Sequence, residues 1–520
     1  MRIMANKSLF QSIAGRLLAK PDAVNAAGAP AYKLAPQHKL AQLAATGTLS
    51  ATFYAEPKQQ LDDVLALAGQ VSPEFLAKAA IYARRKGHMK DMPALLLACL
   101  SVLDPVTFAR AFPRVIDNGR MLRTFVQIMR SGAVARKSLG SRPKAMIEAW
   151  LAQATDAQII AASVGQSPSL ADVIRMVHPK PATAERKALY AYLIGKPYDV
   201  AALPEALRAF EDFKRDPSKP VPDVPFQMLT ALELTPKQWA KIGQGAGWQM
   251  LRMNLNTFAR HGAFDEPGFT RMVAKRIASE SEIKKARVLP YQLMAAFKAA
   301  GKDVPDDVRE ALQDAMEIAL ANVPAIDGAI VIAPDVSGSM ASPVTGVRKG
   351  ASSAVRCIDV AALVAAAMLR VNKKARVLPF ENDVVPVQLN PRDSVMTNAK
   401  KLAAIGGGGT NCSAPLELLN AEKAKVDLFV FVSDNQSWMD AHKGQATGVM
   451  AEWAKLKSRN KDAKLVCIDI QPYGTTQAME RDDILNVGGF SDAVFEVMER
   501  FATAKIGPAH WVGEIEKIEL

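Results

Sequence analysis

The chain has 520 residues, too many for a single hydrophobic core, and length alone suggests about three domains. Its 49% hydrophobic and 22% charged residues exclude a disordered chain. The start of the chain has no secretory signal, the longest wholly apolar run (360–369) is too short to span a membrane, and the four cysteines form no C-x-x-C pair. We therefore expect a cytoplasmic protein without a membrane span, a disulfide framework or a zinc site.

The net charge of +13 is unevenly distributed. Residues 325–520 hold 22 Lys and Arg against 23 Asp and Glu, which leaves a net charge of +14 for residues 1–324. Within that part, residues 101–150 carry nine basic and three acidic residues. A basic excess confined to one region favours a polyanionic partner for it, and a well-solvated surface is the alternative.

Residues 8–322 show apolar positions at helical spacing and no convincing strand alternation. Several of these segments open with a helix start signal, such as Ser72-Pro73 and Asp104-Pro105. Many successive helices with short connections indicate helix pairs stacked in a HEAT-like or armadillo-like array. The clearest segments are residues 61–70, 73–86, 93–103, 142–154 and 304–323.

After Pro324 strand-like and helical segments alternate. The expected strands are residues 328–335, 375–382, 427–435 and 464–472, and the expected helices are 353–372, 413–425 and 448–460. Near-continuous apolar strands that alternate with helices predict a parallel sheet covered on both faces. The sequence thus predicts a helical domain in residues 1–324 and an α/β domain with a doubly wound parallel sheet in residues 325–520.

A set of oxygen ligands falls where the expected strands end. Asp335, Ser337 and Ser339 alternate directly after one strand, Thr410 follows four glycines, and Asp434 ends another strand. Ligand sites in parallel sheets lie at the carboxyl ends of the strands, so these side chains should meet. Carboxylates and hydroxyls are hard oxygen ligands, which favour a divalent metal ion, above all Mg²⁺.

Other interpretations explain less. Asp335 could be a helix cap followed by two incidental serines, but this accounts for neither Thr410 nor Asp434. A hydrolase would need a G-x-S-x-G elbow and a suitably placed His, and the residues around Ser337 and the later histidines provide neither. A phosphate-transferring Asp335 would need a second acid two residues on, where Ser337 stands. We therefore predict that the protein is not an enzyme.

The order D-x-S-x-S, Thr, Asp resembles the metal-ion-dependent adhesion site of the von Willebrand factor type A domain. The resemblance implies that the three hydroxyls ligate the metal and that the two Asp act largely through water. It also implies that a vacant position accepts an acidic group from a protein partner. The metal residues on this reading are Asp335, Ser337, Ser339, Thr410 and Asp434.

An A domain that follows a long basic helical array resembles the Ro autoantigen family, whose helical part is called the TROVE domain. Residues 169–181 match the family's pattern of an acid, two aliphatic residues, a basic residue and His-x-Lys-Pro. Residues 141–151, 224–229 and 284–297 are also similar to TROVE segments, so the resemblance covers essentially the whole chain. The matching residues of the first pattern are Asp172, Val173, Ile174, Arg175, His178, Lys180 and Pro181.

This resemblance implies that the helical repeats close into a ring whose basic hole admits single-stranded RNA ends. It also implies an outer surface that binds small noncoding Y RNAs, and a role in RNA quality control and the stress response alongside an exoribonuclease. Basic side chains can neutralise phosphates, and His178 can contact RNA or, alternatively, be a buried, hydrogen-bonded residue. The candidate RNA-binding residues are Arg120, Arg123, Arg130, Arg136, Lys137, Arg142, Lys144, Arg175, His178 and Lys180.

The sequence therefore predicts a noncatalytic RNA-binding protein that combines an all-α, HEAT-like ring with a metal-binding A domain. The alternative is a protein-binding A-domain adaptor whose helical part is a scaffold without a role in RNA binding. The split of the charge between the two parts favours RNA.

Overall fold

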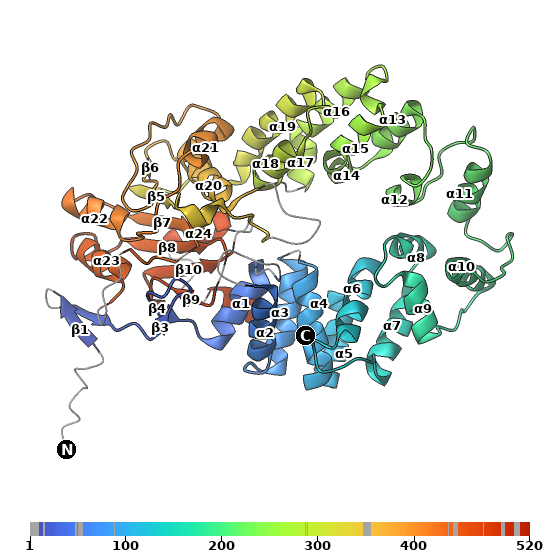
Figure 1. Ribbon diagram of the computed structural model, residues 1–520, viewed down its shortest axis with the longest axis horizontal. Coiled ribbons are helices and arrows are strands. Elements are labelled where there is room, and N and C mark those ends of the chain that lie inside the picture. Colours follow the sequence, from blue (N-terminus) through green and yellow to red (C-terminus); the bar gives the residue numbers. More distant parts are fainter. Residues whose placement is uncertain are drawn as a thin grey trace. The chain divides into compact units, whose positions relative to one another are not determined.

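The chain folds as two compact units, each built from several stretches of sequence (Figure 1). The first unit comprises Met1–Asp63, Gly247–Asn256 and Thr270–Gly513, and the second comprises Val64–Ala246, Thr257–Phe269 and Glu514–Leu520. The computed structural model describes residues 10–13, 16–46, 49, 56–87, 89–286, 288, 290–346, 355–434, 436–439, 446–471, 473–489, 494–503 and 510–520.

The second unit is made of helices that pack mainly on those one or two places away along the chain, as in a stack of helix pairs. The predicted helical array is thus confirmed, whereas its closure into a ring stays a prediction. The helices are α3 (Pro73–Arg85), α4 (Asp91–Leu103), α5 (Pro105–Val115), α6 (Gly119–Ser131), α7 (Ser141–Gln153), α8 (Asp156–Ser163), α9 (Leu170–Val177), α10 (Ala184–Ile194), α11 (Glu205–Arg215), α12 (Phe226–Leu229), α13 (Pro236–Gly245) and η2 (Ala263–Asp265). Helices at the sequence boundaries of the units are α2 (Pro57–Ala68), α15 (Leu255–Arg260), α16 (Phe269–Ile277) and α25 (His510–Glu516).

The predicted start signals begin helices as expected. Ser72 Oγ accepts a hydrogen bond from the Phe75 N–H at 3.1 Å at the start of α3. Asp104 Oδ1 accepts from the Val106 N–H at 2.9 Å at the start of α5. In both cases the side chain satisfies an N–H that has no partner within the helix, and the following proline fits the first turn.

The first unit contains a five-stranded parallel sheet with the strand order β10–β8–β7–β5–β6. Its strands are β5 (Ile330–Pro334), β6 (Arg376–Val377), β7 (Leu428–Ser433), β8 (Lys464–Asp469) and β10 (Ile484–Gly488). The sequence predicted the first four, and it missed β10. Along the chain this is the order 5-4-3-1-2, a doubly wound topology whose direction reverses between β5 and β7.

Helices cover both faces of this sheet. On one face α22 (Ala414–Ala421) and α23 (Gly448–Arg459) pack over a core that includes Phe429, Phe431 and the fully buried Trp453. The alternate residues of the strands point to the other face, where α20 (Cys357–Val371) packs against β5 and β7. The α/β prediction is therefore confirmed. Residues 353 and 354, which were expected to open α20, lie outside the described residues.

Several helices that precede the predicted boundary at residues 324 and 325 lie in the same compact unit as the sheet, and three of them are α-helices between residues 280 and 319. They are α17 (Glu280–Ala286), α18 (Pro290–Ala299) and α19 (Asp306–Ala319). Lys298 Nζ of α18 lies 2.6 Å from Asp359 Oδ2 of α20, and Glu317 of α19 accepts from Arg370 at 3.2 Å. The remaining helices of this unit are α1 (Pro36–Thr46), α14 (Trp248–Met253), η3 (Leu320–Asn322), η4 (Gly338–Ala341), α21 (Val395–Ala403) and α24 (Val494–Ala502).

The expectation that residues 8–322 contain no strands is wrong at the start of the chain. Four short strands occur there, and Tyr32 of one pairs antiparallel with Thr476 in a three-stranded sheet, β3–β4–β9. Strands of two to four residues leave too short an alternation to recognise. The four strands are β1 (Phe10–Ile13), β2 (Arg16–Ala19), β3 (Ala23–Val24) and β4 (Pro30–Lys33). The distant partner of β4 is β9 (Thr475–Thr476).

No helix among the described residues is both long and apolar enough to cross a membrane.

Candidate functional site

The predicted oxygen ligands lie at the point where the strand order reverses. Asp335 directly follows β5 and Asp434 directly follows β7, and these strands are neighbours in the sheet. Asp335 accepts two hydrogen bonds: from the Ser337 N–H to Oδ1 at 2.8 Å, and from Ser433 Oγ to Oδ2 at 2.7 Å. The ligand crevice expected for a doubly wound sheet is therefore lined by these acids.

The three predicted hydroxyl residues are buried beside the two acids. Ser337 Oγ and Ser339 Oγ lie 3.3 Å apart, in and next to the short helix η4, and the Ser339 side chain hydrogen-bonds Asp434. The Thr410 carbonyl accepts from the N–H of Trp438 at 3.1 Å, which ties the Thr410 loop to the segment after Asp434. Hydrogen bonds and short contacts thus join Asp335, Ser337, Ser339 and Asp434, while Thr410 is buried in the loop that contacts Gly338 through Gly408.

The glycines before Thr410 allow their loop to approach its neighbours closely. Gly406 has φ +140° and Gly407 has φ +120°, a region that residues with a side chain rarely adopt. A Cβ on Gly408 would lie 2.6 Å from Glu381, whose Oε2 accepts the Gly408 N–H at 2.9 Å. The Gly408 carbonyl in turn accepts from Gly338 between the two serines, at 3.0 Å. Sequence reasoning identified the glycines but missed Glu381, which anchors them.

The electrostatics of this cluster are unfavourable without a cation. Burial and the charge of Asp434 raise the pKa of Asp335 to about 7, and burial raises the pKa of Asp434. Among the described residues, neither acid forms a salt bridge, and no basic side chain contributes to either pKa. Two buried carboxylates and three buried hydroxyls fit a hard divalent cation, which would offset the negative charge.

The candidate RNA-binding residues lie in the second unit, and three of them line a cavity of about 540 Å³. Arg130 comes from the end of α6, Lys137 from the following loop and Lys144 from the first turn of α7, and Met176 of α9 completes the wall. The N-terminus of α7 has no side-chain cap. Cationic side chains thus line a cavity beside a helix N-terminus, an arrangement that suits phosphate.

The other predicted RNA-binding residues differ in their exposure and in the hydrogen bonds that they already make. Arg123 is half-buried and donates to the Val164 carbonyl at 2.6 Å, and Arg136 is half-buried against Gly140. Arg175 is exposed and donates to the Ile194 carbonyl at 2.8 Å. Arg120, Arg142, His178 and Lys180 are exposed. The alternative of a buried His178 is therefore wrong: this residue ends α9 with φ +53°, and its backbone N–H caps the helix while the ring stays accessible.

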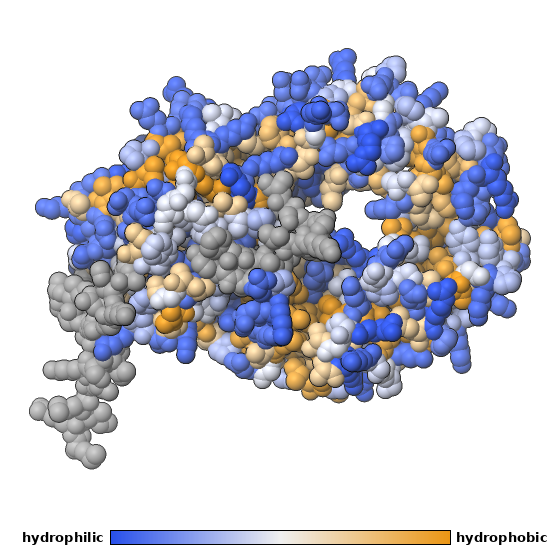
Figure 2. Space-filling model, viewed as in Figure 1, coloured by the Kyte–Doolittle hydropathy of each residue, from blue (hydrophilic) through white to orange (hydrophobic). Residues whose placement is uncertain are grey.

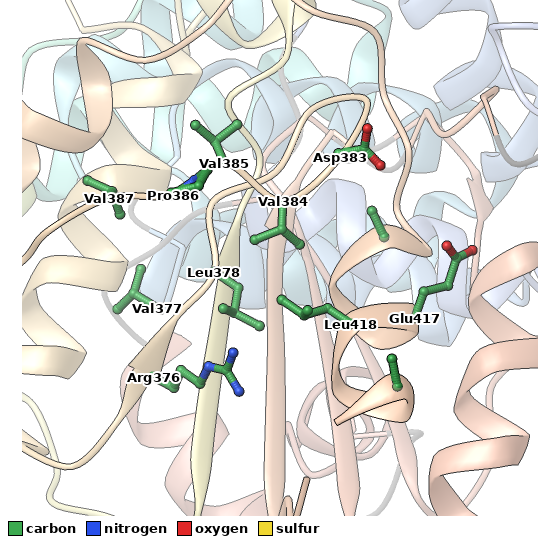
Figure 3. Close-up of a pocket in the computed structure, with 12 residues that line it drawn as sticks. Arg376, Val377, Leu378, Asp383, Val384, Val385, Pro386, Val387, Glu417 and Leu418 are labelled. Carbon is green, nitrogen blue, oxygen red and sulfur yellow. The ribbon is translucent and has the colours of Figure 1, made fainter. Parts of the chain in front are cut away.

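A second cavity, of about 770 Å³, lies between the edge strand β6 and α22 and was not predicted (Figure 3). Leu378, Val384 and Leu418 point toward one another in it. Arg376 at its end forms an ion pair with Glu422, with Nη2 and Oε1 2.8 Å apart. Figure 2 shows hydrophobic residues on the surface in this area. Its lining residues are scattered over three segments of the chain, so the sequence gives no local signal for it.

A helical array together with a doubly wound sheet and an oxygen-rich crevice at its switch point defines a helical-repeat protein with a von Willebrand factor type A domain. Residues 329–502 match the family model described as the Ro60 vWA domain. Over 93% of the chain and 95% of the relative, the sequence is 25% identical to the RNA-binding protein RO60 of Deinococcus radiodurans. It is also 25% identical to RNA-binding protein RO60 of Caenorhabditis elegans, over 49% of this chain and 40% of that one.

The fold is also similar to a solved structure. The crystal structure of the Deinococcus radiodurans RO (RSR) protein matches with a TM-score of 0.62 and 22% sequence identity, and the match covers 91% of this chain and all of that one. Residues 329–502 are thus similar to a Ro60 von Willebrand factor type A domain, and the chain as a whole is similar in sequence and fold to the RO60 protein of Deinococcus radiodurans.

Proposed function

We propose that this protein is a noncatalytic RNA-binding protein of the Ro type. The observation that carries the proposal is the basic cavity formed by Arg130, Lys137 and Lys144 beside the uncapped N-terminus of α7. It lies in the part of the chain that holds the whole basic excess. Two relatives whose names describe them as RNA-binding proteins support the proposal.

The test is to replace Arg130, Lys137 and Lys144 with Ala together and to measure the affinity for an unstructured single-stranded RNA over a range of salt concentrations. Each lost phosphate contact should reduce the slope of log K against log salt by about 0.7, so the triple variant should lose about two units. A general charge effect would give the same loss for any three cations.

A matched control separates these possibilities. Lys373, Lys374 and Lys461 are exposed residues of the sheet unit, and their replacement with Ala removes the same charge. We expect the control variant to keep nearly the wild-type slope. If both variants lost the same amount of slope, RNA binding would be nonspecific charge attraction and the proposal would be wrong. If the wild type bound no RNA, the adaptor alternative would be favoured.

We further propose that the bound RNAs are small noncoding Y-like RNAs and the single-stranded ends of misfolded or decaying RNAs. The family resemblance supports this, as it supports a role in RNA quality control and the stress response with an exoribonuclease. A structured RNA with a 3′ overhang should then bind much better than the same duplex with blunt ends. A covalently closed single-stranded circle carries as many phosphates but no end, so it should bind poorly; equal affinity for the circle and the overhang would contradict the need for an end.

For the crevice we propose a divalent cation, with Mg²⁺ as the favoured metal. The hydroxyls of Ser337, Ser339 and Thr410 and the carboxylates of Asp335 and Asp434 would hold it. When bound, the cation supplies the positive charge that the two buried carboxylates otherwise lack. The fit between this donor set and a hard cation supports the proposal.

A further inference from the structure

The cavity between β6 and α22 lies along an open edge of the parallel sheet. The N–H of Leu378, directly after β6, donates to the Ile332 carbonyl of β5 at 2.8 Å, which fixes the side of β6 that faces the sheet. Backbone groups of successive strand residues point alternately to the two sides, so the N–H and C=O of Val377 point away from β5. Within the described part of the chain, no strand pairs with this outer side of β6. The edge can therefore accept another strand.

The chain itself covers only the far end of this edge. The Val385 N–H donates to the Pro379 carbonyl at 2.8 Å, and Val384 forms a β-bridge with Phe380, so the chain folds back on the residues that follow β6. Residues 376–378 line the cavity of about 770 Å³ instead. Successive side chains of a strand point to opposite faces, so a cavity that contacts three residues in a row runs along the edge and not over one face.

The walls of this cavity are largely aliphatic. Leu378, Val384 and Leu418 point toward one another across it (Figure 3). Leu378 is buried, whereas Val384 and Leu418 are only partly buried although they pack against the core of the sheet. An aliphatic side chain that entered between them would remove this remaining apolar surface from water.

The charged rim of the cavity is acidic. Arg376, Asp383 and Glu417 line it, but Arg376 is neutralised by its ion pair with Glu422. Asp383 and Glu417 lie toward the end of the cavity away from Arg376 (Figure 3), and both are exposed. Glu417 accepts a hydrogen bond from Ser413 Oγ at 2.7 Å, and neither acid forms a salt bridge with a described residue. The rim thus carries uncompensated negative charge, which favours a cationic group from the occupant.

We propose that this cavity is a docking site for an extended segment of a partner protein, which adds one strand to the edge of the sheet. The backbone of that segment pairs with Val377, and one of its aliphatic side chains enters between Leu378 and Leu418. A Lys or Arg of the same segment reaches Asp383 and Glu417. RNA does not fit here, because the two acids repel phosphates. Docking at this edge depends on neither the RNA-binding cavity nor the metal crevice.

The probe for the test is a fluorescein-labelled octapeptide, selected on the full chain from a phage-displayed random library and titrated by fluorescence anisotropy. The selected peptides should carry aliphatic residues at alternate positions and a Lys or Arg, and bind with a Kd of about 10–100 µM, as expected for a small interface. Asp383→Lys with Glu417→Lys should weaken binding at least about 10-fold. A peptide with Glu in place of its basic residue should prefer this double variant to the wild type, which a misfolded variant could not do.

Glu310→Lys with Asp314→Lys is the matched control, because both are exposed acids of α19 that do not line the cavity. This control should bind the peptide within about twofold of the wild type. If the double variant at Asp383 and Glu417 bound the peptide as tightly as the control does, or if the selection enriched no peptide, the proposal would be wrong.

Methylated peptides test whether the occupant is a strand. A strand turns alternate amides toward its partner, so N-methylation of one alternate set should weaken binding about 10-fold and methylation of the other set should have little effect. Equal effects of the two sets would overturn the strand pairing. Sedimentation of the wild type tests the other occupant: a dimer that Asp383→Lys with Glu417→Lys dissociated would assign the edge to a second copy of the chain and would also overturn the proposal.

Discussion

Replacement of Asp335 by Asn should stabilise the metal-free protein, and a bound divalent cation should remove most of this advantage. In metal-free protein, Asp335 is fully buried and its pKa rises from 3.8 to about 7. At pH values between these two pKa values, the folded chain keeps a proton on Asp335 that the unfolded chain has already lost. The free energy of unfolding must therefore fall as the pH rises from about 4 to about 7, and the loss is complete above the folded pKa.

The size of the effect follows from the shift. About three pKa units correspond to about 4 kcal/mol at pH 8, and full burial means that solvent does not screen this cost. Asn removes the charge but cannot accept both hydrogen bonds that Ser337 and Ser433 donate, a loss of about 1 kcal/mol. We expect metal-free Asp335→Asn to be more stable than the wild type at pH 8 by about 3 kcal/mol. Saturating Mg²⁺ at 100 times Kd should stabilise the wild type by about 2.7 kcal/mol and the variant hardly at all.

The assay is thermal unfolding of the sheet unit within the full chain, followed at several pH values in EDTA and in excess Mg²⁺. In EDTA the Tm of the wild type should decline between pH 5 and pH 8, and that of Asp335→Asn should change much less and lie roughly 5 °C higher at pH 8. Mg²⁺ at 100 times Kd should raise the Tm of the wild type almost to that of the variant, because about 2.7 kcal/mol offsets most of the difference of about 3 kcal/mol. A variant that is less stable than the wild type in EDTA at pH 8, with the same dependence on pH, would refute this reasoning.

Three further predictions concern other parts of the structure. Gly408→Ala should weaken Mg²⁺ binding without unfolding the sheet unit, because the new Cβ would displace Glu381 and the loop that Glu381 anchors. Calorimetric titration measures the affinity for Mg²⁺, and an unchanged affinity would contradict the prediction. Lys298→Met should destabilise the chain by about 1–3 kcal/mol at pH 7, because it leaves the buried Asp359 with one cation fewer. Since the pKa of Asp359 is lowered in the folded chain, this difference should vanish as acid protonates the carboxyl group, and denaturation at pH 7 and pH 3 can check this. Asp335→Asn should leave RNA affinity within about twofold of the wild type, since the basic cavity belongs to the other unit; an RNA titration that showed a loss as large as that of the triple basic variant would contradict the separation of the two sites.

The fold could be predicted wherever a local pattern was long enough to decide it. Helices such as α3 and α5 carry both a periodic apolar face and a capping residue, and strands β5, β7 and β8 are continuous apolar runs. The short strands β3 and β4 pair locally, but the pairing of β4 with β9 exists only because the rest of the fold brings these distant segments together. Strand β10 ends the parallel sheet, and its five buried residues include Asn486, which breaks the apolar run.

The basic surface shows where residue type alone is insufficient. Nine basic residues between positions 101 and 150 were equivalent in the sequence. The structure separates Arg123, whose guanidinium is used to hold the loop at Val164, from Arg130, Lys137 and Lys144, which line a cavity. A count of charged residues predicts the sign of the partner's charge, but only packing decides which charged side chains remain accessible to that partner.

Two of the acids at the carboxyl edge of the sheet could be predicted from a spacing, and a third from a rule that was applied to only two strands. Asp335, Asp434 and Asp469 each stand at the carboxyl end of an apolar strand, and parallel strands deliver all such ends to one edge. The motif directed attention to the first two acids, because they have counterparts in a known pattern. Asp469 has none there, yet the pairing of β7 with β8 puts it in register with Ser433 at the same edge of the sheet. In a parallel sheet, every acid at the end of a buried strand should therefore be counted before the charge of that edge is assigned, because all strand ends meet there.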